Sequence, residues 1–393
     1  MKCKWQIKKL SEIVDFNPRE SLQKGIIAKK IGMDKLQPFC RDIMSYENET
    51  FTSGAKFRNG DTIMARITPC LENGKIAKVD ILDEDEIGFG STEYIVFRAK
   101  EGIDADYLYY LVCSSIVREP AIKSMVGSSG RQRVQTDVLR NLDIKVPSVE
   151  EQKVISGILR NLDDKIKINN TINNNLEEQA QAYFDKLFVV NADPNWTECT
   201  LSDIGSVIAG GTPSKSKLEY YANQGIAWIT PKDLSVDKSK FISRGENDIS
   251  ELGFSKSSAT KMPAGTILFS SRAPIGYIAI AQNEVTTNQG FKSVIPNENI
   301  GTAYVYFLLK NLLPTIEGMA SGSTFKEISG TVMKSVPTVI PDADTIQLFS
   351  NLCEPIFQEQ EVLESENKHL SALRDSLLQK LMSGEIDVSG LVF

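Results

Sequence analysis

Two segments of the chain, residues 148–190 and 342–393, repeat apolar side chains every seven residues. A second, mostly apolar row lies four positions after the first, as in the seam of a coiled coil. The pattern therefore predicts two long helices that pair along these rows. Pro355 is expected to bend the second helix or delay its start. The expected seam residues are Ile155, Leu159, Leu162, Ile166, Asn169, Asn173 and Leu176 in the first helix and Phe349, Ile356, Leu363, Asn367, Leu370 and Leu377 in the second.

Both seams become polar near their centre, at Asn169 and Asn173 in the first helix and at Gln360 and Asn367 in the second. Buried amide side chains cost stability but fix the register of a coiled coil. We therefore expect the two helices to pair antiparallel, with their polar layers in contact. The alternative is that residues 169–175 form a solvated break in the first helix.

The regions that precede the two helices are similar to each other. Trp5 is followed by Leu-Ser-Glu-Ile at residues 10–13, and 191 residues later Trp196 is followed by Leu-Ser-Asp-Ile at residues 201–204. A period of this length corresponds to a whole domain. The apolar runs predict strands at 62–65, 75–79 and 93–97 with a helix near 105–115, and strands at 265–269, 275–281 and 291–295 with a helix near 303–312.

The fold class that follows is α/β (α+β), with two pseudo-symmetric globular domains that are each followed by a long helix. Asp104 is placed to cap the helix of the first domain. The polar stretches 212–217 and 235–261 are expected to be loops. The expected boundaries are 1–147 for the first domain, 148–190 for the central helix, 191–341 for the second domain and 342–393 for the C-terminal helix.

Composition and charge limit the class of protein. No run approaches the roughly 18 apolar residues of a membrane span, and no apolar stretch follows the first basic residues, so we expect no signal peptide and a cytoplasmic location. The six cysteines are scattered, which favours reduced thiols over disulfides. The net charge is −7, but residues 342–393 alone contain ten acidic and three basic side chains. The two domains are near neutral, and could present local basic faces to an anionic partner.

Motifs that would indicate catalysis are missing from the sequence. His369 is the only histidine, which excludes a histidine-dependent triad or a histidine-rich metal site. There is no phosphate-binding loop of the Walker type. Residues 88–93 lack the third glycine of a dinucleotide-binding turn, and residues 17–20 are only faintly similar to the Asn-Pro-Pro-aromatic motif of amino-methyltransferases. The acidic residues 83–86 are better explained as a surface turn than as a metal site. We expect a binding protein without metal or cofactor.

Several motifs resemble those of one family, the specificity subunits of type I restriction–modification systems, and the resemblance covers nearly the whole chain. Residues 341–347 depart from it, because they lack the Glu-Gln pair that begins the first long helix. The motifs are residues 172–184, similar to the family's first conserved helix, residues 373–386, similar to its usual C-terminus, residues 210–214 with 227–234, similar to the start of a target-recognition domain, and residues 147–152, similar to the entry to the first helix.

The resemblance implies a non-catalytic subunit in which each repeated domain recognises one half of an asymmetric, two-part DNA sequence. The helices would set the unspecified spacer, since about 35 helical residues span about 50 Å and one duplex turn is about 34 Å. They would also dock two adenine methyltransferase subunits, and nuclease–translocase subunits would join the full complex. S-adenosylmethionine, ATP and Mg²⁺ would belong to those partners.

Recognition of bases requires Arg, Lys, Asn, Gln, Ser or Thr on loops that reach a groove of the DNA. The candidates lie in the Gly/Ser loop that closes each domain, after equivalent strands and in polar loops. An open alternative is that the closing loops are solvated segments with incidental charge, and that Arg66 and Arg272 form surface salt bridges. The candidates are Arg66, Arg131, Gln132 and Arg133 in the first domain and Lys215, Lys217, Arg272, Asn288, Gln289, Thr324 and Lys326 in the second.

Other functions remain open from the sequence alone. The chain could be a coiled-coil adaptor whose duplicated domains bind proteins, or the recognition module of a different restriction architecture. An enzyme with an unrecognised site is the least supported alternative. DNA binding that weakens with salt would argue against the adaptor, because phosphate contacts release counterions.

Overall fold

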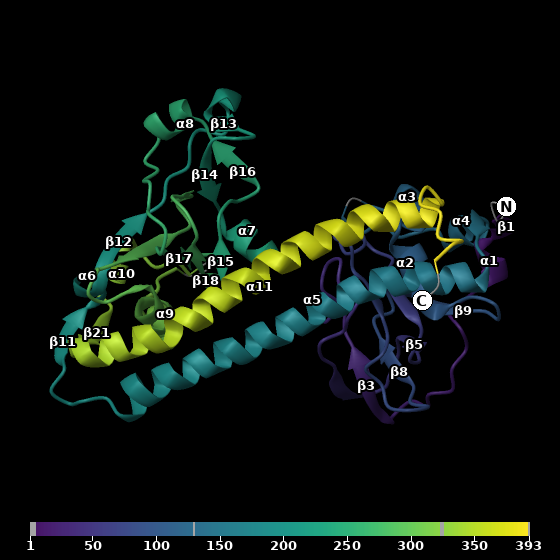
Figure 1. The fold of residues 1–393 in the computed structure, drawn as a ribbon, viewed down its shortest axis with the longest axis horizontal. Coiled ribbons are helices and arrows are strands. Elements are labelled where there is room, and N and C mark those ends of the chain that lie inside the picture. Colours follow the sequence, from purple (N-terminus) through teal and green to yellow (C-terminus); the bar gives the residue numbers. More distant parts are fainter. Residues whose placement is uncertain (1–4, 129, 323–325, 392–393) are drawn as a thin grey trace. The chain divides into compact units, whose positions relative to one another are not determined.

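The computed structural model describes residues 5–128, 130–322 and 326–391. It divides into two compact units, one made of Met1–Ile168 with Asn367–Phe393 and the other of Asn169–Glu366. Each unit therefore contains one globular domain and a stretch of each long helix (Figure 1). Thr324, one of the predicted DNA contacts, lies outside the described residues.

The domain of the first unit has two four-stranded sheets and a short antiparallel strand pair. The strand pair consists of β1 (Gln6–Lys9) and β10 (Asp143–Val146). One sheet has the strand order β2 (Val14–Phe16), β9 (Tyr94–Ala99), β6 (Thr62–Ala65) and β7 (Ile76–Lys78). The other sheet has the strand order β4 (Glu47–Thr50), β3 (Ile27–Ile31), β8 (Gly88–Gly90) and β5 (Ala55–Phe57). The helices are α1 (Leu10–Ile13), α2 (Ala105–Cys113), α3 (Ser115–Lys123) and α4 (Thr136–Arg140). Tyr107 and Leu111 of α2 share one core with Ile95 and Phe97 of β9.

The domain of the second unit is built in the same way. The strand pair consists of β11 (Thr197–Thr200) and β21 (Pro337–Ile340). One sheet has the strand order β12 (Gly205–Ala209), β20 (Lys292–Pro296), β17 (Ile267–Ser271), β18 (Ile275–Ala281) and β15 (Phe241–Ile242). The other sheet has the strand order β13 (Tyr221–Ala222), β16 (Asn247–Ile249), β14 (Ile226–Ile229) and β19 (Thr286–Thr287). The helices are α6 (Leu201–Ile204), the 3-10 turn η2 (Leu218–Tyr220), α7 (Pro231–Val236), α8 (Glu251–Ser255), α9 (Thr302–Met319) and α10 (Gly330–Lys334).

The two domains repeat the same strand connections. The pair β6–β9 recurs as β17–β20, and the parallel pair β3–β8 recurs as β14–β19. The registers also agree, because Ala65 lies opposite Tyr94 in the first domain and Ser270 lies opposite Phe291 in the second. The prediction of two pseudo-symmetric α/β domains, each followed by a long helix, is confirmed.

Local predictions succeeded where the pattern was long enough. Strands β6 and β18 have the predicted bounds, and the carboxylate of Asp104 caps α2 by accepting a hydrogen bond from the backbone N–H of Tyr107 at 2.8 Å. The expectation that residues 235–261 form a loop is wrong. This stretch contains β15, β16 and α8, and it buries Phe241 and Ile249. These elements have two to five residues and lie in a polar stretch, so no apolar run such as that of β6 marks them.

The central helix α5 (Val149–Phe184) is continuous and passes into a π-helical turn at Asp185–Val190. The alternative of a solvated break within it is therefore wrong. Asn169, at the centre of the predicted polar layer, is fully buried, and its amide donates a hydrogen bond of 2.7 Å to the carboxylate of Glu366. The Glu366 carboxylate pairs with the NH₂ group of this side chain, and the helix buries Asn169 without a break.

The C-terminal helix α11 (Ala343–Ser383) is also continuous. It begins well before Pro355, so the prediction that this proline delays the helix start is wrong. The ring of Pro355 is exposed. A proline removes one backbone donor from a helix, and tertiary packing of the buried face compensates for that loss here.

The two long helices pair antiparallel within each unit, as predicted. In the first unit Asp163 of α5 contacts Arg374 of α11 at 2.8 Å. In the second unit Asn169 contacts Glu366, and the side-chain amide of Gln360 donates to the backbone carbonyl of Asn173 at 3.1 Å. Residue numbers that rise along α5 thus fall along α11, and polar groups of the two seams meet.

The buried face of each helix is wider than a two-row seam, because the helix also packs against a globular domain. Asp163 is buried in the first unit and Phe184 in the second, although neither lies in the predicted rows. Of the predicted seam residues, those buried are Ile155, Leu159, Asn169, Phe349, Ile356 and Leu363, and those half-buried are Leu162, Ile166, Asn173, Leu176, Asn367, Leu370 and Leu377.

The first turns of α5 and α11 explain why residues 341–347 lack the Glu-Gln pair that is present at the start of α5. The side chain of Gln152, at the start of α5, accepts a hydrogen bond of 2.9 Å from the backbone N–H of Asp104 and so ties the helix to α2. At the start of α11 the cap is Asp342, which accepts from the N–H of Thr345 at 2.8 Å. Ile346 follows and is buried. An aspartate cap and apolar burial thus replace the Glu-Gln pair.

Candidate nucleic-acid interface

Each domain carries an open cleft beside one sheet, the sheet that contains β3 and β8 in the first domain and the sheet that contains β14 and β19 in the second. Cleft 1 has a volume of about 520 Å³ and is lined by Asn17, Pro18, Arg19, Glu20, Gly54, Ala55, Lys56, Arg66, Thr92, Tyr94 and Val96. Cleft 2 has a volume of about 510 Å³ and is lined by Thr212, Lys215, Tyr221, Trp228, Thr230, Pro231, Lys232, Glu246, Asn247, Asn288 and Gln289. Both clefts include the segment that follows the first sheet strand (β2 or β12) and the turn that follows β8 or β19.

The two clefts occupy equivalent places in the repeat. The turn after β8 is closed by a hydrogen bond from the backbone N–H of Tyr94 to the carbonyl three residues before it, and the turn after β19 by the same bond from Phe291. Thr92 of cleft 1 and Gln289 of cleft 2 therefore hold the same position in this turn. The two domains thus hold different side chains at equivalent backbone positions.

Cleft 1 is positively charged. The Glu20 carboxylate accepts hydrogen bonds from Arg98 at 2.7 Å and lies 2.8 Å from Arg58, while Lys56 donates to the Glu20 backbone carbonyl at 2.8 Å. Desolvation opposes ionisation of Glu20, but the hydrogen bonds from the two arginines lower its pKa overall. The acid is therefore already neutralised, and the positive charge of Arg19 and Lys56 is not cancelled by it.

Two polar atoms in cleft 1 are buried without a hydrogen-bond partner among the described residues. They are the hydroxyl of Tyr94, whose side chain is only 2% exposed, and Nε of Arg66. Glu93 lies 3.7 Å from the Arg66 Nε, too far for a hydrogen bond. Arg19 is exposed and has no ion pair or hydrogen bond in the described part of the chain. Of these three groups, the guanidinium of Arg19 is the one that a ligand in the cleft can reach directly.

Cleft 2 has a different set of groups. Trp228 donates to the Gly211 carbonyl at 3.0 Å and Tyr221 donates to the Pro213 carbonyl at 2.9 Å, whereas the hydroxyl of Thr212 is buried without a hydrogen-bond partner among the described residues. Its side-chain amides belong to Asn247, Asn288 and Gln289. Three of the predicted DNA contacts, Lys215, Asn288 and Gln289, therefore lie around one cleft.

The closing loop of the first domain is held by ion pairs. Arg133 binds the Glu93 carboxylate with three hydrogen bonds of 2.6 to 3.0 Å. Hydrogen bonds from Arg133 are the main reason that the pKa of Glu93 is lowered, and desolvation opposes them. Arg66 adds a weaker ion pair to the same acid. Arg131 is exposed and Gln132 half-buried, and neither lines cleft 1.

The matching loop of the second domain has a looser contact. Arg272 lies 3.4 Å from Glu327. The isolated β-bridges show that Arg272 in the second domain is equivalent to Ile67 in the first. Arg66 precedes Ile67 by one residue, so Arg66 and Arg272 do not occupy equivalent positions in the repeat. Lys326 is exposed. Lys217 lies over the ring of Tyr220 at 5.2 Å and does not line cleft 2.

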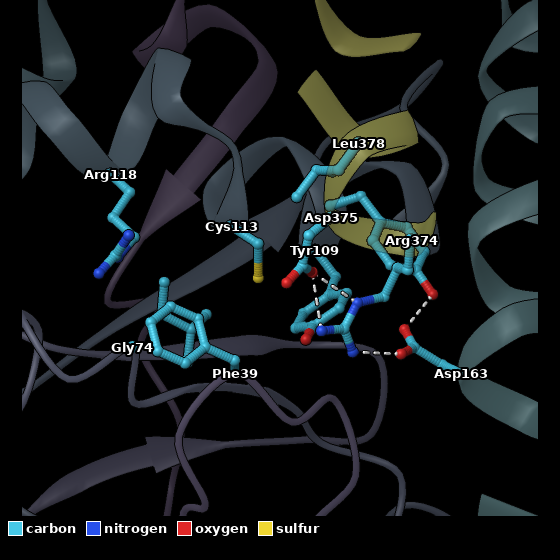
Figure 2. Close-up of a pocket in the computed structure, with 11 residues that line it drawn as sticks. Phe39, Gly74, Tyr109, Cys113, Arg118, Asp163, Arg374, Asp375 and Leu378 are labelled. Atoms are coloured by element: carbon cyan, nitrogen blue, oxygen red, sulfur yellow. Dashed lines mark hydrogen bonds and ion pairs between the residues drawn. The ribbon is translucent and has the colours of Figure 1, made fainter. Parts of the chain in front are cut away.

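A smaller pocket of about 50 Å³ lies in the first unit, where α2 faces α5 and α11 (Figure 2). Figure 2 shows Arg374 between two acids, hydrogen-bonded to Asp163 at 2.8 Å and to Asp375 at 2.8 and 2.9 Å. The Tyr110 hydroxyl also donates to Asp163, at 2.7 Å. Burial raises the pKa of the Cys113 thiol to about 12, so this thiol is protonated at neutral pH. The pocket is a structural junction between the domain and the helices.

Within the described residues, no group of three or more His, Cys, Asp or Glu side chains is arranged to hold a metal ion. The acidic turn at 83–86 instead holds a lysine, because Asp83 and Glu86 each lie 2.9 Å from the Lys29 ammonium. None of the described helices has the length and apolar character that a membrane span requires.

Sequence reasoning missed most of cleft 1. It examined residues 17–20 only for a faint similarity to a methyltransferase motif and did not select Arg19, Thr92 or Tyr94. The available signal was the position of Arg19 just after the first sheet strand, where the second domain has its Gly-Gly-Thr-Pro-Ser segment, residues 210–214. Tyr94 lies in an apolar strand and gave no signal for a binding role.

Residues 2–178 and 194–353 match the family described as the type I restriction modification DNA specificity domain. The match covers both repeated domains and parts of both long helices, so the chain belongs to this family. The two α/β domains with their paired helices are thus those of a type I DNA-specificity protein, as the sequence motifs implied.

Individual relatives agree with this family. The chain is 40% identical to the type I restriction enzyme MjaIX specificity subunit of Methanocaldococcus jannaschii over 179 residues, which are 43% of this chain and 41% of that protein. It is 25% identical to the type I restriction enzyme HindI specificity subunit of Haemophilus influenzae over 408 residues, 84% of this chain and 87% of that one. The crystal structure of the type I restriction-modification system S subunit from M. genitalium shares the fold, with a TM-score of 0.58 at 18% identity and 96% of each chain covered.

Proposed function

We propose that this chain supplies the DNA sequence specificity of a type I restriction–modification complex and has no catalytic activity of its own. Each repeated domain recognises one half of an asymmetric two-part site, and the paired helices set the spacer. The observation that carries the proposal is the pair of equivalent clefts, which present different hydrogen-bonding side chains in matching frames. Equivalent frames suit one ligand class, and different side chains suit different sequences.

DNA is the ligand class that the charge of the clefts favours. Arg19 and Lys56 border cleft 1 and Lys215 borders cleft 2, and Arg19 and Lys215 have no acidic partner among the described residues. Phosphate contacts by such side chains position a protein on duplex DNA without specifying sequence. Partner subunits would contribute further positive charge, since the chain carries a net charge of −7.

The same repeat would dock two methyltransferase subunits on the long helices. Ile168 on α5 is 54% exposed, and Val362 on α11 is 61% exposed. The backbone carbonyl of Ser148 accepts the first hydrogen bond of α5, and the carbonyl of Asp342 accepts the first hydrogen bond of α11. Ile168 and Val362 lie the same number of residues after these two carbonyls, so they hold equivalent positions. An exposed apolar residue repeated in this way fits a partner that binds in two copies.

The cofactors of the complex would bind to the partners. S-adenosylmethionine would bind to the methyltransferase subunits, and ATP with Mg²⁺ to the nuclease–translocase subunits. The sequence lacks a nucleotide-binding loop of the Walker type, which favours this assignment. Equilibrium dialysis of the purified chain with each cofactor tests it, and saturable binding would contradict it.

The decisive experiment is co-expression of this chain with the methyltransferase subunit of its own complex, followed by single-molecule sequencing of methylated adenines in the host DNA. We expect one two-part motif with a constant gap, which disappears when this chain is omitted. Methylation that is unchanged without the chain, or an assembled complex that shows no salt-dependent DNA binding, would contradict the proposal and favour the protein-binding adaptor.

Docking is tested separately by native mass spectrometry of the co-expressed complex. Ile168→Asp and Val362→Asp should each remove one methyltransferase copy, and the double variant should remove both, because a charge is placed in an apolar contact. Leu218→Asp is the matched control, since Leu218 is 84% exposed but lies in a domain rather than on a long helix. Complexes of unchanged mass for all variants would overturn this docking surface.

A further inference from the structure

Building on the proposed function, we infer that the two clefts read different bases, with cleft 1 selecting guanine and cleft 2 selecting adenine in their respective half-sites. The inference rests on which hydrogen-bonding groups in each cleft are still free. Groups that already bind another part of the chain cannot discriminate bases, so only the free groups are compared.

The free groups of cleft 1 are mainly donors. Arg19 presents an exposed guanidinium, and the hydroxyl of Tyr94 has no hydrogen-bond partner within the described residues, whereas Arg66 is excluded because it forms an ion pair with Glu93. The acceptors are occupied: the Glu20 carboxylate binds Arg98 and Arg58, and the side-chain oxygen of Asn17 accepts from a backbone N–H at 2.9 Å. Guanine presents two acceptors, O6 and N7, in the major groove, and the fork of an arginine matches them with two hydrogen bonds.

The free groups of cleft 2 combine donors with acceptors. The side-chain amide of Gln289 is exposed and makes no hydrogen bond to the described residues. Asn288 uses its side-chain oxygen to accept from the Gly290 N–H at 2.8 Å, which fixes the orientation of the amide and leaves its NH₂ group free. Adenine presents one donor and one acceptor in the major groove, and a carboxamide matches both. Lys215 at the rim is then available for a phosphate.

Each cleft contains one buried hydroxyl without a hydrogen-bond partner among the described residues, that of Tyr94 in cleft 1 and that of Thr212 in cleft 2. These hydroxyls therefore do not distinguish the two clefts. The assignment of bases rests on the exposed side chains, the guanidinium of Arg19 in cleft 1 and the carboxamide of Gln289 in cleft 2.

The test is to sequence methylated adenines in cells that co-express the methyltransferase with variants of this chain. Arg19→Ala should relax one half of the two-part motif at guanine positions. Gln289→Ala and Asn288→Ala should relax the other half at adenine positions. One bidentate contact discriminates by about 1–3 kcal/mol, so modification of sites with the wrong base should rise about 5- to 150-fold. In each variant the unaffected half-site is an internal control for folding and assembly.

Matched variants separate base recognition from phosphate contact. Arg19→Lys keeps the charge but loses the fork, so it should preserve DNA affinity and still relax the guanine position. Lys24→Ala and Lys256→Ala remove exposed lysines that line neither cleft, and they should leave both halves of the motif unchanged.

Three outcomes would overturn the inference while leaving the proposed function intact: a two-part motif that stays unchanged in all cleft variants, a relaxed position that is not guanine for cleft 1 or adenine for cleft 2, or weaker modification of all sites without altered motif. A motif that does not depend on this chain at all would instead contradict the proposed function.

Discussion

The same junction between a domain and the helix pair is built from charge in the first unit and from aromatic rings in the second. In the first unit Asp163 binds both Arg374 and the Tyr110 hydroxyl. When residues are counted from the start of each helix, Phe357 is equivalent to Asp163 and Phe307 is equivalent to Tyr110. The ring centroids of these two phenylalanines are 6.1 Å apart. One backbone frame thus accepts two chemistries, because it requires only that the space is filled and every buried charge is paired.

A charge is nevertheless present in the second unit, but it comes from the domain. Lys240 has a side chain that is 5% exposed, and its ammonium lies 2.5 Å from the Glu177 carboxylate on α5 and 3.8 Å from the centre of the Phe357 ring. The backbone carbonyl of Lys240 accepts from the N–H of Ile280, as that of Arg41 accepts from Lys78 in the first unit. Lys240 and Arg41 are therefore equivalent, and both bind an acid of α5. This cation is the part of the junction that the repeat has kept.

The largest effect should follow from removing an aromatic ring of the second unit. Phe184 is 1% exposed and contacts the rings of Tyr304, Phe307 and Phe349. Phe184→Ala should destabilise the second unit by about 4 kcal/mol, through lost burial and a cavity. Hydrogen–deuterium exchange in peptides of β14–β17 measures this. Leu378→Ala in the first unit should cost less, and an equal loss in both units would break the comparison.

The next effect concerns Lys240, the buried cation of the second unit that is equivalent to Arg41 in the first. Glu177→Ala leaves the ammonium of Lys240 buried beside Gln360 without its counter-charge, which should destabilise the second unit by about 3 kcal/mol. Chemical denaturation followed by exchange measurements reports the loss. The matched control is Glu178→Ala, an exposed neighbour on the same helix, expected within about 0.5 kcal/mol of the original chain. A control variant as unstable as Glu177→Ala would show that the helix, not the ion pair, is responsible.

Breaking the ionic junction of the first unit should have a smaller effect. Arg374→Met keeps the aliphatic contact but removes the charge that faces Asp163, which retains its hydrogen bond from Tyr110. We expect a loss of about 2 kcal/mol, read from exchange in peptides of β6–β9. The double variant Arg374→Met with Asp163→Asn should recover part of it. Additive losses in the double variant would mean that the two side chains are not coupled.

The smallest effect distinguishes the closing loops. The pKa of Glu93 is lowered from its usual value of 4.5, so the stabilisation by Arg133 is present above pH 4.5 and is lost as the pH falls through the lower folded value. Glu93→Gln should remove this acid dependence and cost about 1 kcal/mol at neutral pH. Glu327→Gln should change little, because the Arg272–Glu327 contact is 3.4 Å long and more exposed. Acid titration of exchange in the two loops measures the difference.

The sequence alone determined the repeated domains, the two long helices and their antiparallel pairing. These features depend on patterns that are local or strictly periodic: a seven-residue seam, an N-cap at Asp104, and strands such as 62–65 with a clear apolar run. The family also followed from short motifs. Such signals survive because neighbouring residues along a helix or strand enforce them.

The tertiary structure alone decided the sheets built from β3 and β8 and from β14 and β19, the clefts and the pairing of charges. Arg133 and Glu93 are 40 residues apart in the chain, and Lys240 and Gln360 are 120 residues apart. No local pattern reports such distances, so the sequence could not tell that Arg133 is bound while Arg19 is free. Cleft 1 gathers a loop arginine and a tyrosine from an apolar strand, and only folding brings their side chains to one surface. The sequence fixes which groups exist, and long-range packing decides which of them remain available to a ligand.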